Sequence, residues 1–124
     1  MAAPRAALRT SLQAGALYDL AVGAVLLAAG ERVFAALGFE LRSDPFLLRL
    51  ASLPLFVLPA LYATAARSPH VDAFRPAVLA ARGGGGLLIL ALTALYRPPA
   101  APVYAAIGVI DAGWALLHFV LWKR

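Results

Sequence analysis

Four long apolar stretches of the chain each contain one ionisable side chain, namely Asp19, Arg49, Arg82 and Asp111. A charge inside such a stretch is costly to bury, so it normally has a partner or a function. Two acids and two bases can neutralise one another if the stretches pack together. The residue types therefore predict either buried ion pairs that fix helix packing, or a site that handles protons, ions or a polar ligand.

The positions of these charges along their stretches indicate which of them meet. Asp19 and Arg82 lie at similar depth in segments that run in the same direction, given a helical rise of about 1.5 Å per residue. Arg49 lies near the opposite end of its segment and Asp111 nearer the middle, a difference that a long arginine side chain can cover. We expect the pairs Asp19–Arg82 and Arg49–Asp111, with the crossed pairing or one shared four-residue network as alternatives. The balanced charge favours ion pairs that hold the helices in register over a transport site.

Small and polar residues follow these charges at helical spacing. Gly15, Asp19 and Gly23 are spaced so that they share one helix face, where small residues let another backbone approach closely. Similar faces occur in the other three stretches, so we expect all four to point into the interior of a bundle. The residues expected to line a cavity there are Ser52, Gly86, Thr93, Tyr104 and His118.

The stretches have the length of membrane-spanning helices. They cover about residues 12–29, 46–66, 77–96 and 103–122, close to the roughly 20 residues that cross a bilayer as a helix. Helix is required because lipid offers backbone groups no hydrogen-bond partner. The sequence predicts an all-α fold, a single domain over residues 1–124 that forms a four-helix transmembrane bundle with up-down topology. Residues 33–39 either extend the first span or form a short helix at the membrane interface.

The composition also indicates a membrane environment. Hydrophobic residues make up 63% of the chain and charged residues 14%, and the mean hydropathy is +0.83. Soluble domains have about 45–50% apolar and about 25% charged residues. A chain of 124 residues has too small a core to bury this excess, so we expect the lipid bilayer to surround it.

The basic residues predict the orientation. The net charge of +5 forms no clustered basic face, which argues against nucleic-acid binding. Lysine and arginine prefer cytoplasmic loops, and they predict that both termini lie in the cytoplasm. A cleaved signal peptide is the alternative for the N-terminus, although Asp19 inside the apolar stretch argues against it. The residues at the predicted inner ends are Arg5, Arg9, Arg67, Arg75, Lys123 and Arg124, against Arg32, Arg42 and Arg97 outside.

Glycines and prolines mark two further places. Four glycines follow Arg82 directly, but the strand and the Lys-Ser or Lys-Thr of a phosphate-binding loop are missing. We expect close helix packing there, with local unwinding beside a cavity as the alternative. Pro54 and Pro59 lie inside the second stretch and predict a kink. The segment from Arg67 to Pro76 is expected to be a connecting loop.

Metal, cofactor and catalytic sites have little support. The chain has no cysteine and two histidines, His70 in a predicted loop and His118 near the end of the last stretch. A metal or haem would need several converging ligands, so we expect neither a metal nor a cofactor. Because the sequence offers no nucleophile–base arrangement and no paired carboxylates suited to hydrolysis, we expect no enzymatic activity.

The whole pattern resembles a group of small bacterial four-helix inner-membrane proteins described as DoxX-like. The segments that carry the resemblance are ALYDLAVGAVLLAAGERVFAALG, DPFLLRLASLPL, AVLAARGGGGLLIL and AAIGVIDAGWALLHFVLW. The resemblance implies a multi-pass protein of the bacterial inner (plasma) membrane, and some such proteins belong to larger membrane or redox assemblies.

Three functions are consistent with the sequence. The first is a structural or accessory subunit that joins a larger membrane complex or forms a homo-oligomer. The second is a small proton- or ion-coupled transporter that uses Asp19; its size is similar to that of small multidrug resistance transporters, which use a glutamate instead. The third is a lipid-binding or membrane-enzyme module.

Overall fold

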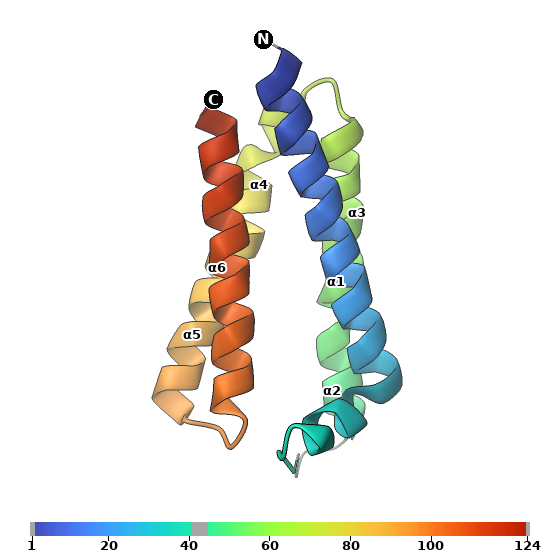
Figure 1. Ribbon diagram of the computed structural model, residues 1–124, viewed down its shortest axis with the longest axis vertical. Coiled ribbons are helices and arrows are strands. Elements are labelled where there is room, and N and C mark those ends of the chain that lie inside the picture. The colour runs from blue at the N-terminus through green and yellow to red at the C-terminus, as the bar shows by residue number, and fades with distance from the viewer. Residues whose placement is uncertain (1, 41–44, 124) are drawn as a thin grey trace.

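The computed structural model describes residues 2–40 and 45–123 and confirms the predicted all-α four-helix bundle. Four helical spans are long and apolar enough to cross a membrane, which suggests a membrane protein: Arg5–Ala36, Leu48–Arg67, Val71–Tyr96 and Ala101–Lys123. The described parts of the chain contain no strand. The spans run alternately up and down, and both termini lie at the same end of the bundle (Figure 1).

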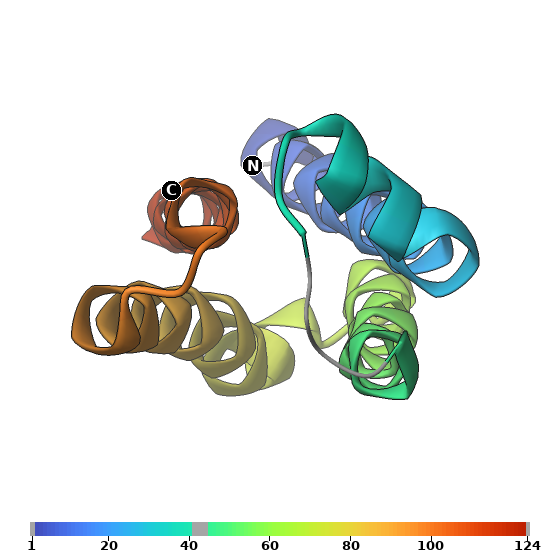
Figure 2. The ribbon, with the colours of Figure 1, turned by 90° about the horizontal axis from the view of Figure 1, so that it is seen from below.

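The first span ends in a sharp bend that is followed by a short helical segment. Helix α1 (Ala2–Ala36) has non-helical backbone angles at Ala29 and continues beyond it. It ends where Gly38 adopts a φ of +83°, a conformation in which a side chain is strained. The N–H of Phe39 donates to the carbonyl of Phe34 at 2.9 Å, which closes the helix end. Beyond the bend, residues 30–36 run across the end of the bundle rather than along the first span (Figures 1 and 2), which agrees with the predicted alternative of a short helix at the end of that span.

The second span is interrupted by a proline. Helix α2 (Pro45–Ser52) stops and α3 (Pro54–Arg67) begins on the other side of Leu53. Pro54 has no N–H to continue the ladder, and the N–H of Leu53 donates to the carbonyl of Leu50 at 3.1 Å. Pro59 stays inside α3 and is buried. The predicted single helix is thus two helices in one span.

The third span begins earlier than predicted. The 3₁₀-helix η1 (Val71–Phe74) and the first two residues of helix α4 (Arg75–Leu79) occupy positions expected to be loop, because Val71 buries its side chain in the core. A π-helical turn, η2 (Ala80–Gly84), then leads into α5 (Gly85–Tyr96). The glycine run is therefore wound throughout as helix. Helix α6 (Ala101–Lys123) forms the fourth span.

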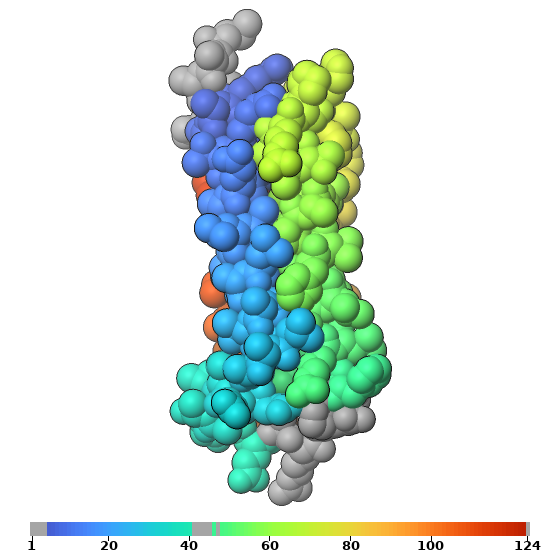
Figure 3. Space-filling view, turned by 90° about the vertical axis from the view of Figure 1, so that its right-hand side faces the viewer, coloured from blue at the N-terminus to red at the C-terminus, as the bar shows by residue number. Residues whose placement is uncertain are grey.

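The helices pack as two pairs. Helix α1 packs on α3, while α4, η2 and α5 pack on α6, and the two pairs meet chiefly where α1 contacts α6 and where α3 contacts η1 (Figures 1 and 2). Viewed from the side, α1 and α3 form one continuous surface (Figure 3). In the described part of the chain, α3 and α5 have no comparable contact with each other.

The apolar core lies in the half of the bundle that carries the termini. Its fully buried members come from α1, α3, η1 and α4, and include Leu8, Leu12, Tyr62, Ala65, Val71 and Val78. Elsewhere the helices present large apolar side chains outward, as at Leu17 and Leu95. Lipid is the medium in which such a surface is stable. The bundle is thus closed at the terminal end and less filled at the other.

Two glycines bring α5 and α6 together. A Cβ atom on Gly86 would lie 2.8 Å from the backbone nitrogen of Ala112 and 2.9 Å from the carbonyl oxygen of Gly108. Such a contact needs the backbones to separate. Gly86 is therefore a packing residue, which agrees with the close helix packing predicted for the glycine run. The prediction that Gly86 lines a cavity is wrong.

Candidate functional site

The centre of the bundle holds one arginine between two aspartates. Nη1 of Arg82, on η2, lies 2.8 Å from Oδ1 of Asp19 on α1 and 2.7 Å from Oδ1 of Asp111 on α6. The Arg82 and Asp19 side chains are 1% and 0% exposed, whereas Asp111 is 15% exposed. We call these three residues the buried triad. The expected pair Asp19–Arg82 is present, and Asp111 joins it.

Arg82 is held from several sides. Nη2 of Arg82 donates to the carbonyl oxygen of Gly15 at 2.9 Å. A Cβ atom on Gly15 would lie only 3.3 Å from that nitrogen, so the glycine leaves room for the guanidinium. Three aromatic rings surround the cation, with Cζ 4.9 Å from the ring centre of Tyr62, 5.6 Å from that of Tyr18 and 6.0 Å from that of Trp114. Such cation–π contacts stabilise a desolvated arginine.

Arg49 lies apart from the triad. Its Nη2 is 3.8 Å from Oε1 of Glu31, and both side chains are about half exposed. The expected pair Arg49–Asp111 is wrong, and so is the four-residue network. The bend at Ala29 carries Glu31 to the end of the bundle where α2 begins, and Arg49 on α2 reaches that nearer carboxylate.

The separation of Arg49 changes the charge of the site. Two carboxylates now face one guanidinium, so the triad has a formal charge of minus one when all three groups are ionised. In the described part of the chain, Arg82 is the only hydrogen-bond or ion-pair partner of Asp111. An uncompensated charge in a low-dielectric interior attracts a proton or a cation.

A cavity of about 450 Å³ adjoins the two carboxylates. Asp19 and Asp111 are its only charged lining residues among those described, and Arg82 is not part of the wall. The cavity lies between the two helix pairs, because its wall comes from α1, α2 and α3 on one side and from η2, α5 and α6 on the other. The apolar wall includes Val22, Leu26, Leu55, Leu58, Ile89 and Ile107.

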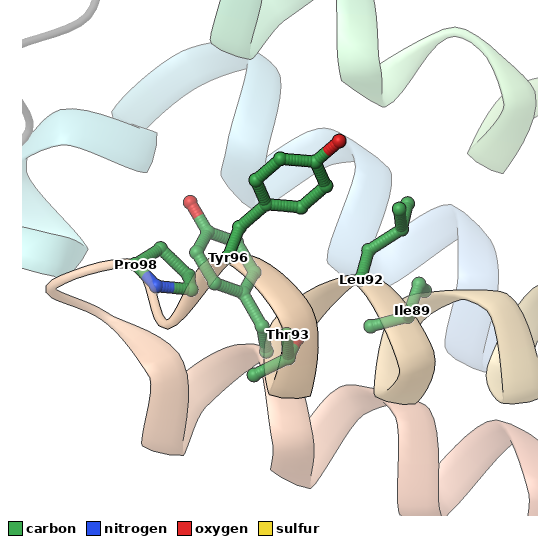
Figure 4. Close-up of a pocket in the computed structure, with 6 residues that line it drawn as sticks. Ile89, Leu92, Thr93, Tyr96 and Pro98 are labelled. Carbon is green, nitrogen blue, oxygen red and sulfur yellow. The ribbon is translucent and has the colours of Figure 1, made fainter.

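The five predicted lining residues lie elsewhere. Ser52 is buried and its hydroxyl donates to the carbonyl of Arg49 at 2.6 Å, which leaves it turned toward its own helix. Thr93 and Tyr104 line a second, apolar hollow at the end of α5, together with Tyr96 and Pro98 (Figure 4). That hollow contains no charged residue among those described.

His118 is buried beside the triad, on the side away from the cavity. Its ring centre lies 5.7 Å from that of Trp114 and 6.4 Å from that of Tyr62. Within residues 2–40 and 45–123, no three histidine, aspartate or glutamate side chains converge in a way that could hold a metal ion. His118 therefore packs among the aromatic rings that enclose Arg82.

The sequence interpretation missed the aromatic residues around Arg82. Trp114 follows Asp111 by three residues, so helical spacing could have placed it near that aspartate. Tyr18 directly precedes Asp19, and adjacent residues do not share a helix face. No signal of this kind marks Tyr62, which reaches Arg82 from another helix. The proximity of Glu31 to Arg49 depends on the bend in α1.

Comparisons with protein-family models, with curated proteins and with solved structures find no match for this chain. The resemblance to DoxX-like proteins therefore stays a prediction.

Proposed function

We propose that the protein is a small membrane carrier in which Asp111, coupled through Arg82 to Asp19, takes up and releases a proton or another monovalent cation. The observation that supports this proposal is the arrangement of two carboxylates on one guanidinium nitrogen, with the partly exposed Asp111 on the wall of a cavity. Ionisable residues within membrane spans commonly mark ion and proton pathways. The proposal assigns no enzymatic activity.

The unequal charge favours a carrier over ion pairs that only hold the helices together. A purely structural contact is least costly when acids and bases balance, because any excess charge must be desolvated without compensation. Here one carboxylate is in excess. Its charge is compensated only when a proton or cation is present, which is the property that a coupling site requires.

Asp111 is the better candidate for the exchanging group than Asp19. Asp19 is fully enclosed, whereas the Asp111 side chain retains 15% exposure and lies on the cavity wall. Exchange requires a path by which the cation arrives and leaves. Asp19 then acts as the fixed counter-charge that keeps Arg82 in place when Asp111 is neutral.

Proton flux into liposomes tests the proposal. The purified protein is reconstituted with a pH-sensitive dye inside the vesicles, and a potassium gradient with valinomycin sets an inside-negative potential. We expect the wild-type protein to acidify the lumen faster than protein-free vesicles, and Asp111→Asn to lose this activity. Because the cation is either a proton or a metal ion, the same assay is repeated with sodium gradients and a sodium-sensitive dye.

The control variant is Arg49→Gln, which removes a charge outside the triad. It should retain wild-type flux. Flux that is unchanged in Asp111→Asn, or absent from the wild-type protein for both ions, would refute the carrier proposal. Size-exclusion profiles of each variant establish that the protein remains folded.

We also propose that the protein resides in a bacterial inner membrane with both termini in the cytoplasm. The terminal end of the bundle carries Arg5, Arg9 and Lys123. There Arg5 pairs with Asp72 at 3.3 Å, and Arg9 donates to the carbonyls of Ala66 and Ser68 at the end of α3. The positive-inside rule places such an end in the cytoplasm. Arg42 and Arg124, which also entered the prediction, lie outside the described residues.

Reporter fusions test the orientation. Green fluorescent protein and alkaline phosphatase are fused in turn to the C-terminus in bacterial cells. A fluorescent fusion without phosphatase activity agrees with a cytoplasmic C-terminus, and the opposite pattern would contradict it.

The accessory-subunit hypothesis has a separate observation in its favour. A Cβ atom on Gly113 of α6 would meet nothing within 4 Å, and Gly113 lies in a shallow apolar hollow with Ile110, Trp114 and Leu117. Exposed small residues let a second helix approach in a membrane. If the protein associates through α6, chemical crosslinking in native membranes should give a discrete adduct that Gly113→Leu abolishes. An unaltered adduct would exclude this face.

A further inference from the structure

We propose that the cavity beside the buried triad binds an organic monocation with an apolar body, whose cationic group lies next to Asp111. The inference rests on the proposed carrier function in that both use the Asp111 carboxylate. It goes further because it assigns the chemical class of the ligand. It concerns equilibrium binding, which can be measured without transport.

The size of the cavity suits a small organic molecule. Its volume of about 450 Å³ lies within the range of roughly 300–1,000 Å³ that is typical of small-molecule sites. A bare metal ion or a proton would leave most of this space unfilled. The wall is apolar except where Tyr18, Asp19 and Asp111 contribute, so polar recognition is confined to part of the surface.

The placement of the charges sets the sign of the ligand. Asp19 and Asp111 are both lining residues of the cavity, but only Asp111 has an exposed side chain, at 15%. Arg82 is not part of the wall and is bonded to the Gly15 carbonyl and enclosed by aromatic rings. The charged group that a ligand in the cavity can contact is therefore the Asp111 carboxylate. An anion would add to the existing excess of negative charge and is disfavoured.

The number of charges sets the valence of the ligand. One positive charge brings the triad and ligand together to neutrality, since the triad carries a formal charge of minus one. A divalent cation would instead leave an excess positive charge in an apolar environment. In the bound state the ligand cation compensates Asp111 as a proton would in the ligand-free state.

The apolar surroundings favour an amphiphilic ligand. The cavity wall includes Leu55 and Leu58 of α3 and Ile89 of α5, two helices that pack on α1 and α6 rather than on each other. The residues exposed near these positions are also apolar, for example Val57 and Leu88. A ligand with an apolar body is compatible with this environment, whereas a small hydrated cation would have to lose its water.

Two adjacent glycines provide a matched test of the cavity. A Cβ atom on either Gly84 or Gly85 would meet nothing within 4 Å, so either position tolerates a side chain. Gly85 lines the cavity, and Gly84 does not. The variant Gly85→Leu should therefore fill part of the cavity, and Gly84→Leu should add the same side chain to the same span without filling it.

The experiment measures binding of tetraphenylphosphonium to the purified full-length protein in detergent by isothermal titration calorimetry. Tetraphenylborate has nearly the same size and shape and the opposite charge. We expect the phosphonium to bind at least about tenfold more tightly than the borate, because desolvated charge pairs commonly contribute that much or more. Asp111→Asn and Gly85→Leu should each weaken phosphonium binding by about tenfold or more, and Gly84→Leu should bind as the wild type does.

Several outcomes would overturn the inference. Equal binding of phosphonium and borate would mean that the cavity selects only apolar bulk. Unchanged phosphonium affinity in both Asp111→Asn and Gly85→Leu would place the ligand elsewhere. Absence of phosphonium binding together with Asp111-dependent proton flux would refute the ligand class and leave the carrier function intact. Asp111-dependent binding without any ion flux would support the ligand class and refute the carrier function.

Discussion

Asp19 and Asp111 lie on the first and last helices, and their carboxylates approach the same nitrogen atom of Arg82, at 2.8 and 2.7 Å. Without the guanidinium, two negative charges at this separation would repel each other strongly in an apolar interior. The three residues therefore behave as one unit, and the effect of changing any of them depends on what the other two retain.

Arg82 should contribute most to stability. The variant Arg82→Gln leaves two buried carboxylates without a cation, and breaking a buried ion pair in this way costs about 3–5 kcal/mol. We expect a large fall in the thermal unfolding temperature, measured in detergent. Arg49→Gln is the matched control, because exposed ion pairs contribute about 1 kcal/mol or less and Arg49 is about half exposed. Equal effects of the two variants would contradict the assignment of Arg82 to a buried site.

The two aspartates should show strong coupling. Asp19→Asn and Asp111→Asn each leave Arg82 with one carboxylate, so the remaining pair is neutral and each single change should be tolerated. The double variant leaves the guanidinium unpaired in the interior, at a cost of about 3–5 kcal/mol. Because each single change is tolerated, a double-mutant cycle of unfolding free energies should deviate from additivity by nearly that whole cost, about 3–5 kcal/mol. Additive effects would mean that the two acids do not share Arg82.

Tyr62 should act through its ring. The ring centre lies 4.9 Å from Cζ of Arg82, and its buried hydroxyl has no hydrogen-bond partner among the described residues. Tyr62→Phe should leave stability nearly unchanged, whereas Tyr62→Leu should lose the cation–π contact, worth about 2 kcal/mol when desolvated. Unfolding temperatures of the two variants distinguish these effects. If Tyr62→Phe is as destabilising as Tyr62→Leu, the hydroxyl rather than the ring is the important group.

Gly86 and Gly84 should respond in opposite directions to alanine. At Gly86 the added Cβ would lie 2.8 Å from a backbone nitrogen of α6, so Gly86→Ala must separate the two helices and lower the unfolding temperature. At Gly84 the Cβ has open space, and alanine favours helix by about 1 kcal/mol over glycine. Gly84→Ala should therefore be neutral or stabilising. A destabilised Gly84→Ala together with an unchanged Gly86→Ala would contradict the observed α5–α6 packing.

The sequence by itself determined the fold class. Four apolar stretches of spanning length admit only helices in lipid, and a chain of this composition has too little core to bury them otherwise. Sequence position also predicted that Asp19 meets Arg82, because depth along a straight helix follows directly from residue number. Neither inference needs knowledge of how the helices bend or pack.

Only the tertiary structure decided the composition of the site. Arg49 is separated from Asp111 because α1 bends at Ala29 and brings Glu31 to Arg49. Tyr62 reaches Arg82 from another span, and Gly86 meets Gly108 rather than a cavity. These contacts depend on helix bends and on the rotation of each helix against its neighbours, which residue spacing within a single helix does not specify. The excess carboxylate beside the cavity is thus a property of the packed bundle, although each of its charges is visible in the sequence.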